Sequence, residues 1–432
     1  MNILLKSTSQ ILGTMPFNYL ERKIHMHDFA LMAIIPMVYY YTFFLAMFEG
    51  NALMSIPECK NICMLGNAMF IEIGVVSFTI NFILSIVRMK RFYPDFYEKL
   101  ENIDSALKSS ALEQNKSRDD SEIAKAQEKV EKRWLVKELI AVAVVAIAFL
   151  AAIYVDVSFV EKHFKYYYFV SISFTFPYFT TCLIQGQFIS LINDISKRLF
   201  KLNTLFENIN QECTVRSPIV KIFDTNLVDP PKPVILNNKI ISTITNEEKK
   251  TSEHTMTDLF RVHEKILSLS VMTNNEFAPQ IVPFMTMCFC ITLYGIFIET
   301  KVIFVAGGIN DFLDYIANTF VIWSIITIFV AYLVLRLCCN AYNDMKKTAM
   351  IIHEIMQKKP PFMLGSDLYY NKMKAFTLQY LHWEGYFQFN GCGLFSLDYT
   401  FIFSSVSAAT SYLIVLLQFD MSAILKFEGL SE

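Results

Sequence analysis

Long apolar stretches alternate with polar and charged ones along the whole chain. Seven of the apolar stretches are Phe29–Phe48, Met64–Val87, Leu139–Val155, Tyr166–Leu191, Phe277–Ile298, Ile316–Leu337 and Tyr399–Phe419. Each is roughly as long as the ~20 residues that a helix needs to cross a hydrocarbon core of about 30 Å. The pattern therefore predicts an all-α membrane protein with seven transmembrane helices.

The basic residues gather in every second connection between these stretches. Arg88, Lys90 and Arg91 follow the second span, whereas the connections on the opposite side hold few, such as Lys60 and Lys301. Lys and Arg accumulate in the cytoplasmic loops of membrane proteins. The distribution thus predicts a cytoplasmic N-terminus and an extracellular C-terminus, which is the inverse of a G-protein-coupled receptor.

The polar connections divide the chain into regions. We expect a cytoplasmic N-terminus (1–28), four spans (29–210) with a cytoplasmic loop (88–138), a flexible cytoplasmic loop (211–257), an inner extension with the fifth and sixth spans (258–338), cytoplasmic helices (339–398), the last span (399–419) and an extracellular tail (420–432). The second loop is expected to be flexible because prolines gather between Pro218 and Pro233. Apolar residues at helical spacing in Ala341–Gln357 and Asn371–Leu381 predict helices that form a cytoplasmic anchor region.

The last apolar stretch, Cys392–Phe419, is unusually rich in small and hydroxylated residues. Steps of four and three along a helix place Ser404, Ala408, Ser411, Val415 and Gln418 on one face, with Phe419 alongside. Small residues on a membrane helix favour close packing against another helix. A polar face at membrane depth is also typical of a helix that lines water. The residues alone leave both interpretations open.

The same stretch resembles a known family. Ser411-Tyr412, five apolar residues and Gln418-Phe419 are similar to the terminal Thr-Tyr-(five apolar)-Gln-Phe signature of insect gustatory receptors, with Ser where Thr is usual. The residues before it, Leu381-His382, Phe389, Cys392-Gly393 and Leu397-Asp398, are similar to the family's segment that leads into the last helix.

The resemblance implies a tastant-gated, non-selective cation channel in the cell membrane of taste neurons, in their dendrites. It also implies a homo- or hetero-tetramer with other gustatory receptor subunits, held together by the cytoplasmic helices. In such a tetramer the last helix lines the pore through Ser404, Ala408, Ser411 and Val415. Gln418 and Phe419 then form a constriction near its outer end.

Glu72 is the most informative single charge, because an acidic side chain within a span usually faces a cavity or a partner. Other polar or aromatic residues lie toward the outer ends of the spans, and the resemblance implies a ligand pocket there. The candidate pocket residues are Asn67, Glu72, Tyr154, Ser171, Tyr294, Asn318 and Trp323. Each of them also fits a role in packing or as an interfacial anchor.

Both a sugar and a bitter plant compound fit such a pocket. A carboxylate beside aromatic rings suits a polyol through hydrogen bonds, or an alkaloid cation through charge and cation–π contact. The high aromatic content of the outer halves favours bitter compounds. Two other functions share these features: a receptor that signals through a soluble partner, and a secondary transporter, which usually shows repeated halves and broken helices.

Several classes of chemistry have no support in the sequence. The net charge of −2 offers no basic surface for nucleic acid, and the nine cysteines show no zinc spacing. His353-Glu354 begins like a zinc-protease motif, but Gln357 stands where the second His is required. We therefore expect no enzyme, metal or cofactor. Cys59 and Cys63 lie close enough in sequence to form a disulfide if their loop is extracellular.

Overall fold

The structure is a computed structural model of the whole chain. It describes residues 17–18, 23–24, 26–49, 62–115, 147, 150–151, 153–154, 167–215, 238–305, 311–358, 371–378 and 388–428.

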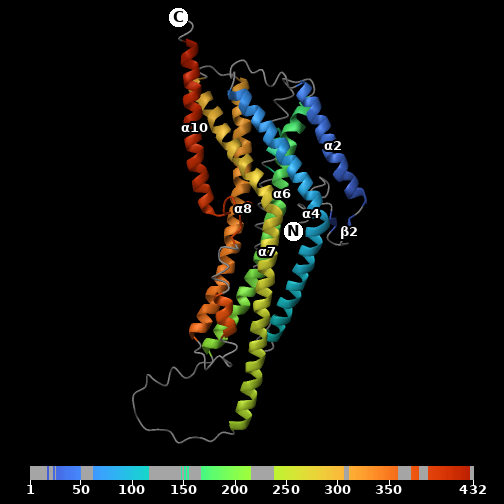
Figure 1. Cartoon of the computed structure of the whole chain (residues 1–432), viewed down its shortest axis with the longest axis vertical. Coiled ribbons are helices and arrows are strands. Elements are labelled where there is room, and N and C mark those ends of the chain that lie inside the picture. The colour runs from blue at the N-terminus through green and yellow to red at the C-terminus, as the bar shows by residue number, and fades with distance from the viewer. Residues whose placement is uncertain are drawn as a thin grey trace, which may run out of the picture.

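Long helices build almost all of the described chain (Figure 1). They are α2 (Met26–Glu49), α4 (Ile62–Asn115), α6 (Tyr167–Val215), α7 (Asn238–Val305), α8 (Asp311–Lys358) and α10 (Tyr399–Glu428). Near the N-terminus, β1 (Phe17–Asn18) and β2 (Lys23–Ile24) pair antiparallel, with Phe17 opposite Ile24. The predicted all-α class is confirmed for the described residues, this short pairing aside.

Six of the seven predicted spans lie in these helices, and the third, Leu139–Val155, lies largely outside the described residues. In the described part of the chain, three helices are long and apolar enough to cross a membrane: Thr255–Ile303, Ala317–Gln357 and Tyr399–Phe419. A fourth candidate is the pair Glu72–Arg88 and Arg91–Ala111 of α4, which meet at a bend of 55°.

The helices extend far beyond the predicted spans and continue across three of the expected region boundaries. α4 continues to Asn115 through the expected loop 88–138, and α8 crosses the expected boundary at 338/339 without a break. α7 already begins at Asn238, inside the segment 211–257 that was expected to be a flexible loop. The prolines of that segment all precede Asn238, and the rest of it contains neither proline nor glycine to stop a helix.

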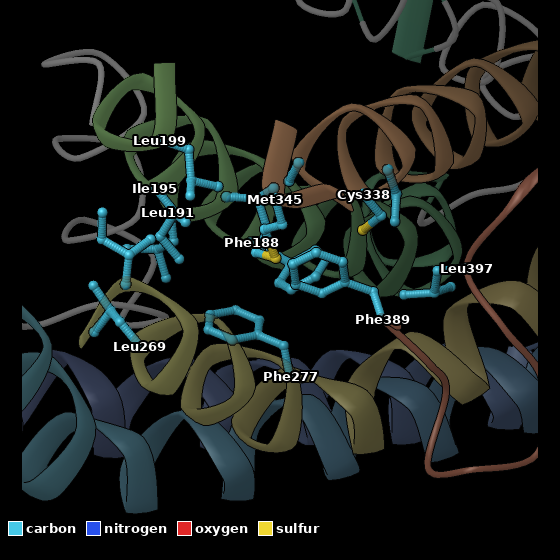
Figure 2. Packing of buried hydrophobic residues seen from close by; sticks show 14 of the residues in the cluster. Phe188, Leu191, Ile195, Leu199, Leu269, Phe277, Cys338, Met345, Phe389 and Leu397 are labelled. Carbon is cyan, nitrogen blue, oxygen red and sulfur yellow. The ribbon is translucent and has the colours of Figure 1, made fainter. Parts of the chain in front are cut away.

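One continuous apolar core joins α4, α6, α7 and α8, with α6 at its centre. Phe188, Ile195 and Leu199 of α6 have no solvent-exposed surface. Figure 2 shows these residues between α7, which contributes Phe277, and α8, which contributes Met345. α6 is therefore the helix around which the others pack.

The ends of α4, α6 and α8 and the first half of α7 form a bundle at the lower end of Figure 1. We call it the inner bundle, after the predicted orientation. Arg198 of α6 holds Asp104 of α4 through two hydrogen bonds, Nε–Oδ1 at 3.1 Å and Nη2–Oδ2 at 2.7 Å. Asn203 of α6 donates to the Asp344 carbonyl of α8 at 2.9 Å and accepts from the Thr348 hydroxyl at 2.6 Å. These polar contacts fix the register of three helices.

A short helix at 371–378 packs on the inner bundle. Its Phe376 stacks on Phe260 of α7, with ring centroids 4.4 Å apart, and meets the ring of His263 edge-on at 5.2 Å. Burial lowers the pKa of His263 to about 3, so its imidazole is neutral at physiological pH. His263 lies well before Phe277, where the predicted fifth span begins.

Candidate pore helix and outer aromatic site

α10 is the helix that the rest of the chain covers least. It runs along one side of the bundle and touches α7 and α8 (Figure 1). None of its span residues is buried, against half of those in the spans of α7 and α8. Large apolar side chains are exposed along it, including Phe403 at 75% and Phe419 at 66%. A single copy of the chain therefore leaves one side of a long apolar helix exposed.

The predicted pore residues lie on the uncovered side of α10. Leu413, Leu416 and Leu417 pack against a small cluster of α7 and α8 residues on the other side. Ser404, Ser411, Val415, Gln418 and Phe419 are exposed, and Ala408 is half-buried. The Ser404 and Ser411 hydroxyls donate to the carbonyls of Thr400 and Ser407, at 3.1 and 3.0 Å. Each of these two hydroxyls thus has a partner within the helix, and both roles predicted for this face remain open.

The start of α10 is fixed by Asp398, which caps the helix. Its Oδ1 accepts hydrogen bonds from the Thr400 amide at 2.9 Å and from the Thr400 hydroxyl. Its Oδ2 accepts from Ser396 at 2.9 Å and from Gln388 at 3.1 Å. Burial opposes ionisation of this carboxyl, but the hydrogen bonds from Thr400 and Ser396 outweigh it and lower the pKa of Asp398. Such a cap satisfies amide groups that have no partner within the helix.

The eleven residues 388–398 before α10 fold into a compact turn, which we call the linker. Asn390 accepts from the Gly393 amide at 2.7 Å, and its own amide donates to Asn274 of α7 at 3.1 Å. Cys392 and Gly393 both adopt the left-handed conformation, with φ of 53° and 74°. The linker, which continues directly into α10, is thus also tied to α7 by a hydrogen bond.

The linker also enters the apolar core. Phe389 and Leu397 are almost fully buried, and Figure 2 shows them beside Met345 and Cys338 of α8. The Leu397 amide donates to the Phe389 carbonyl at 2.8 Å, which closes the turn. The linker therefore connects the core around α6 and α8 to the first residue of α10.

Aromatic side chains from four helices gather in the half of the bundle that includes α2. The ring centroid of Tyr39 on α2 lies 4.3 Å from that of Phe78 on α4 and 5.7 Å from that of Phe176 on α6. The centroids of Phe78 and Phe176 are 5.6 Å apart. Tyr178, two residues further along α6, packs against Trp323 of α8 at 5.4 Å. These rings are largely buried and form what we call the outer aromatic site.

Two glycines allow close approach around these rings. Gly74 of α4 lies where a side chain would contact the Tyr178 hydroxyl, at 3.6 Å. Gly295 of α7 lies where a side chain would meet Ser324 at 3.2 Å and Phe320 at 3.4 Å, so α7 and α8 are close at this level. Phe320 packs edge-on against Tyr294 at 4.8 Å.

The candidate pocket residues divide into three groups in the structure. Trp323 is buried and packs against Tyr178 of the outer aromatic site. Tyr294 is half-buried and packs against Phe320, one turn before Trp323 on α8. Glu72, Tyr154 and Asn318 are exposed on the single chain. The side chains of Asn67 and Ser171 lie outside the described residues.

The sequence analysis did not select the rings of Tyr39, Phe78, Phe176 and Tyr178, because it took its candidates toward the outer ends of the spans. The signal that could have found them is the presence of aromatic residues at matching depths in adjacent spans.

Comparison with known proteins agrees with this architecture. The family model described as 7tm Chemosensory receptor matches residues 4–423. The chain is 39% identical over 473 aligned residues to gustatory and pheromone receptor 33a of Drosophila melanogaster, and the alignment covers 98% of each protein. The fold is similar to that of the insect olfactory receptor OR5 from Machilis hrabei, with a TM-score of 0.57, 13% identity and coverage of 96% and 97% of the two chains. The helical bundle, its apolar spans and the match along nearly the whole length lead to one conclusion: the chain belongs to the insect seven-transmembrane chemosensory receptors, in the gustatory receptor family.

Proposed function

We propose that the chain is a subunit of a tastant-gated, non-selective cation channel, in which four copies surround a pore lined by α10. The observation that carries this proposal is the uncovered α10, which is apolar at its ends and hydroxylated in its middle. Other copies of α10 would cover the apolar parts, and the hydroxylated face would meet water and ions. The likeness in fold to an insect olfactory receptor is compatible with such an assembly.

In this proposal Ser404, Ala408, Ser411 and Val415 line the pore, and Gln418 and Phe419 close it. A ring of apolar side chains closes a pore by expelling water, and a small rotation or spreading of the helices lets water return. Phe419 is two-thirds exposed on the single chain, so four copies of its ring are available to meet at the axis. The linker supplies the connection, because it joins the first turn of α10 to the core and to Asn274 of α7.

The ligand would bind near the outer aromatic site, and we propose a bitter or deterrent plant compound. Flat aromatic walls with a few hydroxyl groups suit small, largely apolar molecules. The Tyr39, Tyr178 and Trp323 rings offer such walls. Glu72, Asn67 and Ser171 would add polar contacts toward the outside. The name of the Drosophila relative includes both taste and pheromones, and both kinds of ligand are small molecules.

The test is the current carried by cells that express the chain, alone and with other gustatory receptor subunits, under a panel of sugars and plant alkaloids. We expect alkaloids to evoke a cation current, Ser411→Val to reduce it and Phe419→Ala to leave the pore partly open without ligand. Thr410→Val is the matched control, because Thr410 is also exposed on α10 but lies about a third of a turn from Ser411 and away from the proposed pore face.

Silence in every subunit combination, with the protein at the cell surface, would contradict the channel proposal. That outcome would favour a receptor that acts through a soluble partner, or a transporter. A current evoked only by sugars would keep the channel and overturn the ligand class.

A further inference from the structure

Arg88 is a buried cation at the bend of α4. Its side chain is 1% exposed, and its guanidinium carbon lies 3.6 Å from the ring centroid of Phe277 on α7. Nη2 donates to the Glu276 carbonyl at 2.8 Å and to the Gln280 side-chain oxygen. The guanidinium also interacts with the Tyr93 hydroxyl and with the charge of Glu276. A buried charge is costly unless surrounding polar groups form hydrogen bonds with it. The polar side chains next to Arg88 therefore determine how stable this arrangement is.

Gln280 of α7 connects these groups. Its Nε2 donates to the Asn81 carbonyl of α4 at 3.0 Å, and its own carbonyl accepts from Gln185 of α6 at 3.4 Å. Asn81 in turn donates from Nδ2 to the Thr181 hydroxyl of α6 at 2.9 Å. Side chains of α4, α6 and α7 therefore form one polar cluster around Gln280, which is completely buried.

Two prolines of α7 lie in the turns to which these polar side chains bond, and they leave the carbonyls of Asn275 and Pro279 without the N–H partner of a regular helix. Pro279 and Pro283 have no backbone N–H, so the helix loses hydrogen bonds in the turns that precede them. The carbonyls of Glu276 and Gln280 lie three residues before the two prolines, and they accept from Arg88 and from Gln185. Side chains of neighbouring helices thus bond to backbone groups in the turns that the prolines loosen.

The cluster still contains polar atoms without a partner. Among the described residues, Oδ1 of Asn81 and Oε1 of Gln185 are buried and have no hydrogen-bond partner. Nε and Nη1 of Arg88 are also buried, and in the described part of the chain the Tyr93 hydroxyl is the one further group that hydrogen-bonds with this guanidinium, so it leaves at least one of the two nitrogens unsatisfied. Nε and Nη1 can only donate, and the two amide oxygens can only accept. The Asn81 and Gln185 amides cannot simply be reversed, because their nitrogens already donate to Thr181 and Gln280.

We propose that this cluster is a binding site for ordered water between α4, α6 and α7. Water is the small ligand that both accepts from Arg88 and donates to Asn81 and Gln185, and buried waters typically make about three such bonds. A bound anion would satisfy Arg88 but would face the two amide oxygens. Bound water at the bend of α4 would allow the helices to shift, because a water molecule can exchange hydrogen-bond partners more easily than two side chains that bond directly. The proposal does not depend on channel activity.

Radiolytic hydroxyl-radical labelling with mass spectrometry tests it on the full-length chain in lipid nanodiscs. Radicals form from bound water, so a buried ring next to such water is oxidised although bulk solvent does not reach it. Phe277 and Phe284 provide a matched pair, since both lie on α7 and both have no exposed surface. We expect Phe277 to be oxidised several times faster than Phe284, and Arg88→Met to reduce the rate at Phe277 to that at Phe284.

Equal rates at Phe277 and Phe284 in the wild-type chain would overturn the proposal without any need for a variant. If Arg88→Met does not fold, Asn81→Leu removes a different member of the cluster and is also expected to slow labelling at Phe277. A melting temperature of the wild-type chain that rises when gluconate is replaced by chloride, with no such rise for Arg88→Met, would assign the site to an anion and overturn the water proposal.

Discussion

Replacing Gly391 with alanine places a methyl group too close to the edge of the Phe395 ring. A Cβ atom at position 391 would lie 2.5 Å from Cζ and 2.9 Å from both Cε atoms of that ring. Carbon atoms in contact are ordinarily about 3.5–4.0 Å apart, so the ring has to move by about 1 Å. It is not free to do so at no cost, because it stacks on Phe401 of α10 with centroids 4.6 Å apart.

The size of the effect follows from what the ring gives up. An aromatic pair contributes about 0.5–1.5 kcal/mol beyond its burial, and a side chain forced away from its rotamer costs about 0.5–1.5 kcal/mol. We therefore expect Gly391→Ala to lower the free energy of unfolding by about 1–3 kcal/mol. Denaturant unfolding of the purified chain in detergent measures this quantity.

A double-mutant cycle isolates the cause. Phe395→Ala removes the ring, so Gly391→Ala in that background should cost almost nothing. Gly393→Ala is the matched control: no atom lies within 4 Å of the added methyl group, but the backbone has a φ of +74°. Its cost of about 1–2 kcal/mol comes from the left-handed backbone and should remain unchanged without the ring. If Gly391→Ala costs the same with and without Phe395, the steric argument is wrong.

Two further predictions concern the cap of α10 and the inner bundle. Asp398→Ala should lower the free energy of unfolding by about 0.5–2 kcal/mol, and Asp398→Asn by clearly less because asparagine also caps helices; equal losses in denaturant unfolding would contradict the capping role. The pKa of His263 is about 3 in the folded chain, below the ordinary value of about 6.5. The unfolded chain therefore binds the extra proton between these values, and stability should be lost as the pH falls from about 6.5 toward 3, by up to about 1.4 kcal/mol per pH unit. His263→Leu should remove this part of the pH dependence, and parallel wild-type and variant profiles would refute it.

The sequence predicted the helical class well because membrane helices require long apolar stretches. It also placed Ser404, Ala408 and Ser411 on one face of α10, since steps of three and four define a face regardless of the neighbours; that this face lines a pore stays a prediction. It did not show how far α4 and α7 continue beyond the spans, because charged residues on an exposed helix resemble those of a loop.

The contacts inside the bundle lay beyond such reasoning. Asn81 and Gln280 are 199 residues apart in sequence, and nothing in the period of either helix indicates that they meet. Arg88 was counted among the basic residues that indicate a cytoplasmic connection, whereas the structure buries it against Phe277. A charge at the end of a span looks the same in the sequence whether it faces water or another helix.

The unbroken length of α7 has a consequence for how members of this family differ from one another. Its 68 residues form one helix about 100 Å long, with contacts to α4, α6 and α8 along it. One inserted residue would turn everything beyond it by about 100° and remove every later side chain from its partner. The alignment with the Drosophila relative covers 473 positions, more than the 432 residues of this chain, so it must contain gaps. We expect those gaps to lie outside α7, for instance in the segment 216–237, where extra residues change no register.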